Sequence, residues 1–173
     1  MTETKDLSAL FAATKILVVD DEHYMRKVVR TLLMSIGVRN IHEAPDGPSG
    51  LDAIRNTQPD IVIVDWQMPG LDGASFVRMV RSPETFPFPD VPIIMLTGHS
   101  ERSRVIEAVQ VGVNEFLLKP VSSKALRSRL VSVLTKPRPV VKSGGYYGPM
   151  PRNLAASAIN EDGDKAMTFF LVN

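Results

Sequence analysis

The sequence predicts a doubly wound α/β fold in which a parallel sheet is covered by helices on both faces. Short apolar runs alternate along the chain with stretches whose apolar residues recur at helical spacing. Most of the runs are continuously apolar, which is typical of strands that are buried on both faces. A helix after each strand supplies the crossover that parallel neighbours need.

The predicted strands are the apolar runs at residues 15–20, 40–44, 60–65, 91–97 and 115–119. The predicted helices are the five stretches at residues 25–36, 48–56, 73–81, 101–111 and 122–134. Gly37 provides a stop for the first of these helices. Right-handed crossovers leave few ways to wind such a chain, and the commonest five-stranded result is the flavodoxin-like strand order 2-1-3-4-5.

Polar residues follow the four strands that this order makes adjacent. Asp20 and Asp21 follow the first strand, Asp65 ends the third, Thr97 ends the fourth and Lys119 ends the fifth. The carboxyl ends of parallel strands lie on one edge of a sheet, where open α/β sheets bind ligands. The sequence therefore predicts one site assembled from four strands, with phosphoryl transfer to Asp65 as its chemistry.

Each of these residues, taken alone, has a simpler structural interpretation. An aspartate pair after a strand is more often a helix N-cap. Asp65 precedes a Met-Pro-Gly sequence that is typical of a loop. Thr97 could simply be the last residue of a strand, and Lys119 could form an ion pair on the surface. The joint placement of all of them on one edge is what favours a functional site.

Composition excludes several other classes of protein. A length of 173 residues suits one domain with a substantial core, and a net charge of +1 gives no general reason to expect nucleic-acid binding. Cysteine is absent and the three histidines lack metal-ligand spacing, so zinc is disfavoured. The polar opening is unlike a secretory signal, and no apolar run approaches the roughly 20 residues that span a bilayer. We expect a cytoplasmic protein without membrane contact.

Four motifs resemble those of the CheY-like receiver domain of bacterial two-component response regulators. They are VVDDE at residues 18–22, IVIVDWQMPGLDG at 61–73, IIMLTGH at 93–99 and FLLKP at 116–120. The motifs occur in family order at family spacing and are specific when taken together. The resemblance implies a phosphoprotein of two-component signal transduction.

The resemblance also implies the chemistry of the site. Asp65 would be the phosphoacceptor that attacks a partner kinase's phosphohistidine and becomes an aspartyl phosphate. Asp20, Asp21, Asp65 and the backbone carbonyl of Gln67 would hold Mg²⁺, with Mn²⁺ as a substitute. Lys119 would contact the acyl phosphate as a point charge.

Further residues would set the switch and the lifetime of the signal. The Thr97 hydroxyl would bond a phosphoryl oxygen and move toward it, and Phe116 would rotate into the vacated space. Gln67 and His99 match positions that tune the attack of water on the phosphoryl group. Neither residue is an acid, so we expect slow or intermediate self-dephosphorylation.

The partners are likewise implied by the resemblance. A histidine kinase or a histidine phosphotransfer protein would donate the phosphoryl group. A downstream protein would bind the face made by the fourth helix, the fifth strand and the start of the fifth helix, roughly residues 97–122. Receivers often dimerise through this face, which leaves a phosphorylation-dependent homodimer open.

We expect an N-terminal extension (1–14), a receiver domain (15–135) and a C-terminal tail (136–173) without a separate output domain. The first half of the tail is rich in Pro and Gly and should be extended. Its apolar stretch, 165–172, would dock on the receiver, add a strand to a partner or stay disordered. The proline-rich connection at 82–90 reads as a rigid surface loop, with an exposed aromatic contact as the alternative.

The sequence thus predicts a stand-alone response regulator that binds proteins when phosphorylated and is no enzyme beyond its own phosphorylation and slow dephosphorylation. A phosphorelay intermediate, passing the group from Asp65 to a second histidine protein, is the alternative. A flavodoxin-like cofactor binder is less favoured, because the acidic loop 20–22 repels phosphate unless a metal intervenes. A haloacid-dehalogenase-type phosphatase is disfavoured, since its nucleophile would sit on the first strand.

Overall fold

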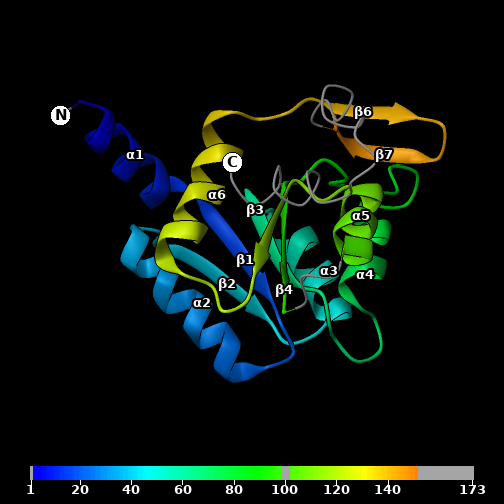
Figure 1. The fold of residues 1–173 in the computed structure, drawn as a ribbon, viewed down its shortest axis with the longest axis horizontal. Coiled ribbons are helices and arrows are strands. Elements are labelled where there is room, and N and C mark those ends of the chain that lie inside the picture. The colour runs from blue at the N-terminus through cyan, green and yellow to red at the C-terminus, as the bar shows by residue number, and fades with distance from the viewer. Residues whose placement is uncertain (1, 99–101, 152–173) are drawn as a thin grey trace.

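The computed structural model describes residues 2–98 and 102–151. A five-stranded parallel sheet in the order β2-β1-β3-β4-β5 forms its centre (Figure 1), which confirms the predicted topology. The strands are β1 (Lys15–Val19), β2 (Asn40–Ala44), β3 (Ile61–Asp65), β4 (Ile93–Thr97) and β5 (Glu115–Leu118).

The described helices are α1 (Thr2–Ala13), α2 (His23–Ile36), α3 (Gly47–Thr57), α4 (Gly73–Val80), α5 (Arg102–Val111) and α6 (Ser123–Thr135). Their ends have local causes. Asp46, Asp72 and Ser122 are the N-caps of α3, α4 and α6, and each side chain accepts a backbone N–H from the first turn. Gly37 ends α2 in the left-handed region at φ 114°, as predicted. No helix in the described ranges is both long and apolar enough to cross a membrane.

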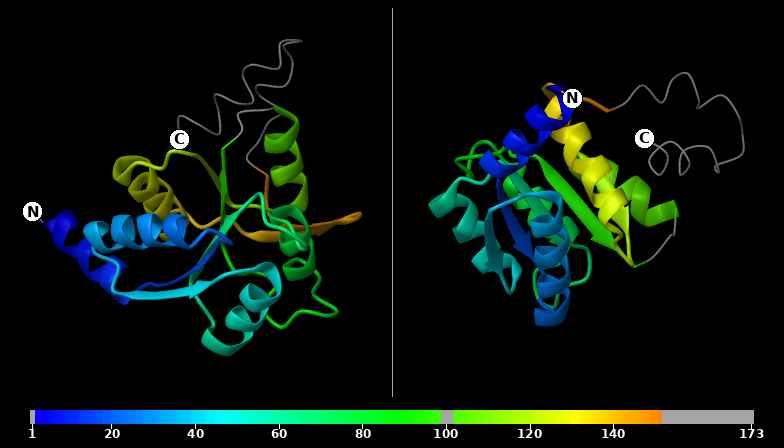
Figure 2. Two further views of the ribbon diagram at one scale, coloured as in Figure 1. Left: turned by 90° about the horizontal axis from the view of Figure 1, so that it is seen from below. Right: turned by 90° about the vertical axis from the view of Figure 1, so that its left-hand side faces the viewer.

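Alternate residues of each strand enter two separate hydrophobic clusters. In β1, Leu17 and Val19 pack in the cluster that includes α3, α4 and α5, while Ile16 and Val18 pack with α1, α2 and α6. Figure 2 shows these two groups of helices on opposite sides of the sheet. Because both faces are buried, the central strands β1, β3 and β4 are apolar along most of their length, whereas the edge strand β2 is partly exposed and contains polar residues.

Helix α1 is a sixth helix that the sequence did not predict. Its Phe11 is 2% exposed and belongs to the cluster of α2 and α6, with the guanidinium carbon of Arg127 5.7 Å from the ring centroid. Leu7, one turn earlier, packs against the same cluster. Among the side chains of α1 that the structure describes, residues 4–13, only Phe11 is buried, so the helical periodicity of the segment does not stand out from its polar composition.

The start of the predicted tail is a hairpin rather than a detached extended segment. Strand β6 (Val140–Ser143) pairs with β7 (Tyr146–Pro149) in antiparallel register. Figure 1 shows the hairpin beside one end of α5. The extended backbone predicted here is present, but it is paired. The apolar stretch at 165–172 lies outside the described residues.

The hairpin docks through close backbone contact. A Cβ on Gly112, which follows α5, would lie 2.9 Å from the carbonyl oxygen of Tyr147. The Arg138 guanidinium donates to the carbonyl of Asn114, and the Tyr147 hydroxyl donates to the carboxylate of Asp90. The hairpin therefore covers the amino ends of β4 and β5, at the opposite edge of the sheet from the predicted site.

The connection between α4 and β4 contains neither helix nor strand, as predicted for residues 82–90. Its Phe86 is 4% exposed and lies in the hydrophobic cluster, with the Arg55 guanidinium carbon 4.9 Å from the ring centroid. Phe88 packs against the same cluster. The aromatic side chains of this loop thus contribute to the core.

Candidate functional site

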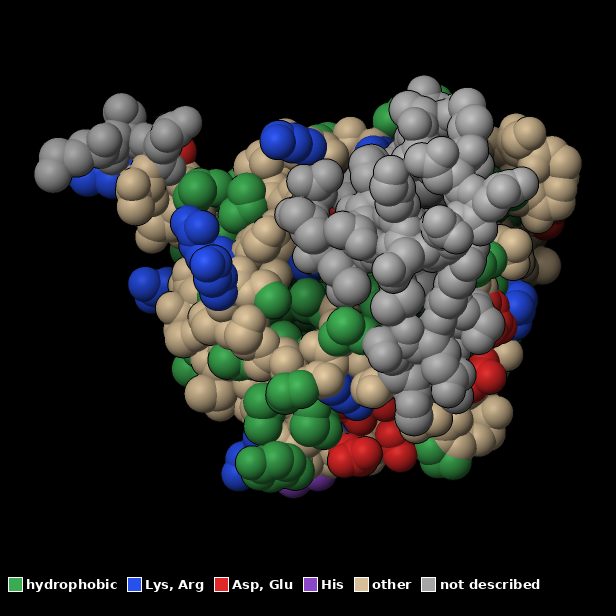
Figure 3. Space-filling model, in the orientation of Figure 1, with side chains coloured by type: hydrophobic (Ala, Val, Ile, Leu, Met, Phe, Trp, Pro, Cys, Tyr) green, Lys and Arg blue, Asp and Glu red, His purple; other side chains and the backbone are tan. Residues whose placement is uncertain are grey.

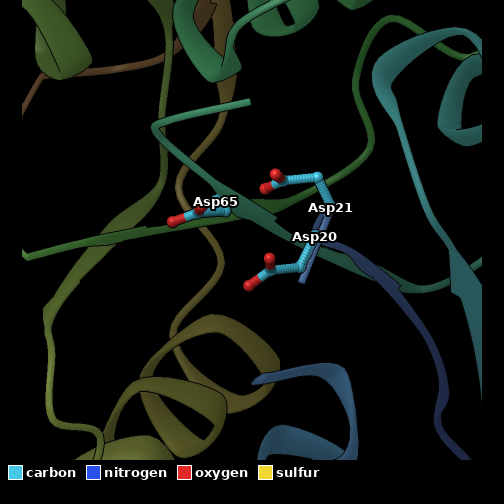
Figure 4. Close-up of side chains that lie close together, drawn as sticks. All are labelled: Asp20, Asp21 and Asp65. Carbon is cyan, nitrogen blue, oxygen red and sulfur yellow. The ribbon is translucent and has the colours of Figure 1, made fainter. Parts of the chain in front are cut away.

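The carboxyl ends of the central strands bring three aspartates together. Asp20 and Asp21 follow β1, and Asp65 ends β3. One carboxylate oxygen of each residue lies within 4.8 Å of the others, and Figure 4 shows the three side chains around a common space. In Figure 3, acidic side chains gather at the lower edge of the molecule with a basic side chain among them. The acids that the sequence placed on one edge therefore do meet.

The three carboxylates differ in burial. Asp20 is fully buried and Asp65 is 3% exposed, whereas Asp21 is exposed. One oxygen of Asp20, Oδ1, accepts the N–H of Glu22 at 2.9 Å. The other, Oδ2, is buried and accepts no hydrogen bond from the described residues. A buried carboxylate oxygen without a donor is costly, and a bound cation would remove that cost.

The aspartate pair is not used to cap a helix. The N-cap residue of α2 is Glu22, whose side chain makes no capping hydrogen bond. By contrast, Asp46 and Asp72 do cap their helices with side-chain oxygens. Neither Asp20 nor Asp21 is therefore the N-cap residue of α2.

Lys119 reaches both buried carboxylates. Its Nζ lies 2.8 Å from Asp65 Oδ1 and 3.9 Å from Asp20 Oδ2, and its side chain is 20% exposed. The lysine is held at this place because its backbone N–H donates to the carbonyl of Thr97 at 2.8 Å. The Lys119–Pro120 peptide is cis.

Burial changes the proton affinity of both inner aspartates. Loss of water raises the pKa of Asp20 from 3.8 to about 6; the Glu22 N–H opposes this rise, and the Asp65 charge adds to it. The pKa of Asp65 is also raised by burial, against the lowering effect of Lys119. Three carboxylates face one ammonium group, so the cluster carries an excess of negative charge that a divalent cation would offset.

The two predicted switch residues are both buried, Thr97 in β4 and Phe116 in β5. Thr97 is the last residue of β4, the strand beside β3, and is 1% exposed. Phe116 is 3% exposed in β5, where it pairs with Met95 and packs in the cluster of α3 to α5. The structure thus gives the positions of these residues, and their predicted movement stays a prediction.

The residues predicted to tune lifetime are only partly described. Gln67 is exposed and lines a hollow of about 490 Å³ beside the acids. Trp66 is 7% exposed and lines the same hollow. His99 lies outside the described residues.

Gly73 is a site residue that the sequence analysis did not identify. It begins α4, and its N–H donates to the carbonyl of Trp66 at 2.9 Å. A Cβ at this position would collide with the carbonyl oxygen of Asp65 and lie 2.9 Å from the Cα of Trp66. Only glycine fits behind the central aspartate. The available signal was the glycine at the end of the PGLDG loop, which we interpreted only as a helix start.

Comparisons with known proteins agree with this geometry. A family model described as the response regulator receiver domain matches residues 16–131. Chemotaxis protein CheY-3 of Vibrio cholerae is 35% identical over 122 residues, which is 70% of this chain and 92% of that protein. Chemotaxis protein CheY of Pseudomonas aeruginosa is 34% identical over 70% of this chain and 97% of its own length.

Solved structures show the same relationship. The structure of V. cholerae CheY4 has a TM-score of 0.63 at 32% identity and covers 70% of this chain and 98% of its own. A putative response regulator from Chloroflexus aurantiacus has a TM-score of 0.66 at 29% identity and covers 71% of this chain and 98% of its own. The chain therefore belongs to the CheY-like receiver domains of two-component response regulators.

Proposed function

We propose that this response regulator accepts a phosphoryl group on Asp65 from a phosphohistidine, in a reaction that depends on Mg²⁺, and signals by binding a protein when phosphorylated. The donor is a histidine kinase or a histidine phosphotransfer protein. The observation that carries the proposal is the position of the Asp65 carboxylate, which lies beside those of Asp20 and Asp21 and has the Lys119 ammonium 2.8 Å away.

The residues present fit a divalent cation. The donor set is made of oxygens, which Mg²⁺ and Mn²⁺ prefer, and Asp20 Oδ2 is a buried oxygen without a hydrogen bond among the described residues. Asp20, Asp21, Asp65 and the backbone carbonyl of Gln67 would hold the ion. When bound, it supplies positive charge that offsets the approach of an anionic phosphoryl group to three carboxylates.

In the transfer step, a carboxylate oxygen of Asp65 attacks phosphorus. The new P–O bond forms as the P–N bond of the phosphohistidine breaks, and the bonding electrons stay on the imidazole nitrogen. Lys119 balances the charge of the resulting acyl phosphate, and the Thr97 hydroxyl bonds one of its oxygens. The protein thus contributes positioning and charge rather than a general base, because an ionised carboxylate is already a nucleophile.

The output follows from the same contacts. Thr97 moves toward the phosphoryl group, and Phe116 turns inward on the neighbouring strand. The change is read by a protein that binds α5, β5 and the start of α6. Neither Gln67 nor His99 is an acid that could assist water, so self-dephosphorylation is slow or intermediate.

A donor with a P–N bond tests the chemistry. We expect phosphoramidate with Mg²⁺ to change the fluorescence of Trp66, the only tryptophan of the chain. Asp65→Asn should abolish the phosphoramidate response. Asp52→Asn, which removes an exposed acid that pairs with Arg55 and is not part of the cluster, should leave it unchanged. A response that persists in Asp65→Asn, or that needs no metal, would refute the proposal.

A further inference from the structure

Arg26 reaches back from the first turn of α2 to the acidic turn that precedes the helix. Its Nη1 donates to the backbone carbonyl of Asp20 at 2.6 Å. Its Nε lies 3.7 Å from Glu43 Oε1, and its Nη2 lies 3.3 Å from His23 Nδ1. The Arg26 side chain is only 13% exposed, which is low for an arginine near the surface.

The carbonyl that Arg26 binds lies where the backbone leaves β1 and turns toward α2. The N–H of Asp20 donates to the carbonyl of Ala44 at 3.2 Å, continuing the pairing of β1 with β2. Beyond Asp20 the chain leaves the sheet and turns toward α2. This turn sets the directions of Asp20 and Asp21, whose charges repel each other and that of Asp65. A charge-assisted hydrogen bond at its base opposes its displacement.

Glu43 of β2 holds Arg26 in place from the other side. It also pairs with Arg30, whose Nη1 lies 3.3 Å from Glu43 Oε2 and whose side chain is 44% exposed. Arg30 is on the same helix and shares the same carboxylate partner. Unlike Arg26, it has no hydrogen bond to the acidic turn within the described part of the chain. Arg30 is therefore a matched control for Arg26.

We propose that Arg26 is a positioning residue for the metal site: through the Asp20 carbonyl it fixes the turn so that the Asp20 and Asp21 carboxylates stay at the separation a divalent cation needs. The proposal deepens the function proposed above and rests on it. It assigns no contact between Arg26 and the metal or the phosphoryl group. Arg26 acts through Asp20, with Glu43 as its support.

The charge and the position of Arg26 have opposite effects on metal binding. A positive charge behind the cluster repels a cation, so its loss alone would tighten Mg²⁺ binding. Loss of the hydrogen bond that fixes the turn weakens Mg²⁺ binding, because the carboxylates are then less well ordered. The sign of the change in affinity therefore separates a positioning role from a purely electrostatic one.

The test is a Mg²⁺ titration of the full chain, followed by Trp66 fluorescence and by the Mg²⁺-induced rise in the unfolding temperature. We expect Arg26→Met to weaken the affinity about 10-fold, the scale seen when partners of metal ligands are removed. The matched variant Arg30→Met should stay within about twofold of the native chain, since exposed ion pairs contribute little. An Arg26→Met affinity equal to or tighter than that of Arg30→Met would overturn the proposal.

Two further comparisons keep the outcomes distinct. The native chain should respond to Mg²⁺, and Asp20→Asn should remove that response. If either result is not seen, the proposed function itself fails. If Arg26→Met does not fold in EDTA, the pair Arg26→Lys and Arg30→Lys decides. A lysine at position 26 keeps the charge but reaches only one of the two partners, so we expect it to bind Mg²⁺ roughly threefold more weakly than Arg30→Lys. Equal affinities of these two variants would overturn the proposal.

Discussion

At the scale of single residues, Asp20 is costly for the fold and useful for the site. It is fully buried, and one of its oxygens has no hydrogen-bond donor among the described residues. Lys119 lies 3.9 Å from that oxygen and also serves Asp65. The metal-free protein therefore holds charge that it stabilises poorly, which is expected where a site must be ready to bind a cation.

Because the buried Asp20 carboxylate is poorly stabilised, we expect the stability of the fold to depend on pH. The pKa of Asp20 is raised in the fold, from 3.8 to about 6, so the folded protein holds the proton more tightly than the unfolded chain. Its contribution to stability is thus present below pH 3.8 and is lost as the pH rises to about 6. In EDTA we expect urea denaturation to show the free energy of unfolding falling over this range by on the order of 1–3 kcal/mol. Asp20→Asn should flatten the curve, and an unchanged slope would contradict the assignment.

Asp20→Asn should have opposite effects on the stability of the metal-free fold and on Mg²⁺ binding. At pH 7.5 in EDTA, Asp20→Asn removes a poorly stabilised charge, so the free energy of unfolding should rise by on the order of 1 kcal/mol. The rise in unfolding temperature on adding Mg²⁺ should be lost, because a ligand of the ion is gone. Calorimetry with and without Mg²⁺ measures both effects. A less stable variant that still responds to Mg²⁺ would be inconsistent with this role.

At the scale of elements, the hairpin is bound to the receiver by close packing rather than by a large apolar face. Arg81, 6% exposed, donates to the carbonyls of Gly112 and Val91 and to the side chain of Asn114. It thereby joins α4 to the starts of β4 and β5. The hairpin lies over this group, so its attachment braces the edge of the sheet opposite the acids.

Gly148→Ala tests this attachment. A Cβ at Gly148 would lie 2.9 Å from the Cα of Gly112, so the hairpin or the loop must shift. We expect the free energy of unfolding to fall by about 1–3 kcal/mol and hairpin amides to exchange faster with solvent. Gly145→Ala, where a Cβ meets nothing within 4 Å, is the control. Equal effects of the two substitutions would show that the contact does not stabilise the fold.

At the scale of the whole molecule, the sequence predicted what depends on local pattern and topology. The order of the strands in the sheet could be predicted from the continuous apolar strands and the handedness of crossovers. The polar residues at the strand ends then predicted that Asp20, Asp21, Asp65 and Lys119 lie close together. These features need no knowledge of side-chain packing.

The features that sequence reasoning missed depend on tertiary contact. Helix α1 packs on the domain through Phe11, which is buried in the cluster of α2 and α6. The hairpin packs through the close approach of its backbone to Gly112. Gly73 matters because the backbone of Asp65 lies behind it. The role inferred for Arg26 depends on how far its side chain reaches. Of these, only Gly73 had a motif-like signal, as the glycine that ends the PGLDG loop.

The most direct test of phosphoryl transfer to Asp65 is the intact mass of the chain after incubation with acetyl phosphate, with Mg²⁺ or with EDTA. We expect a gain of one phosphoryl group that requires Mg²⁺ and is absent in Asp65→Asn. Onward loss of that group to a histidine phosphotransfer protein, rather than to water, would place the chain within a phosphorelay. An unmodified native chain, or a phosphorylated Asp65→Asn variant, would show that Asp65 is not the phosphoacceptor.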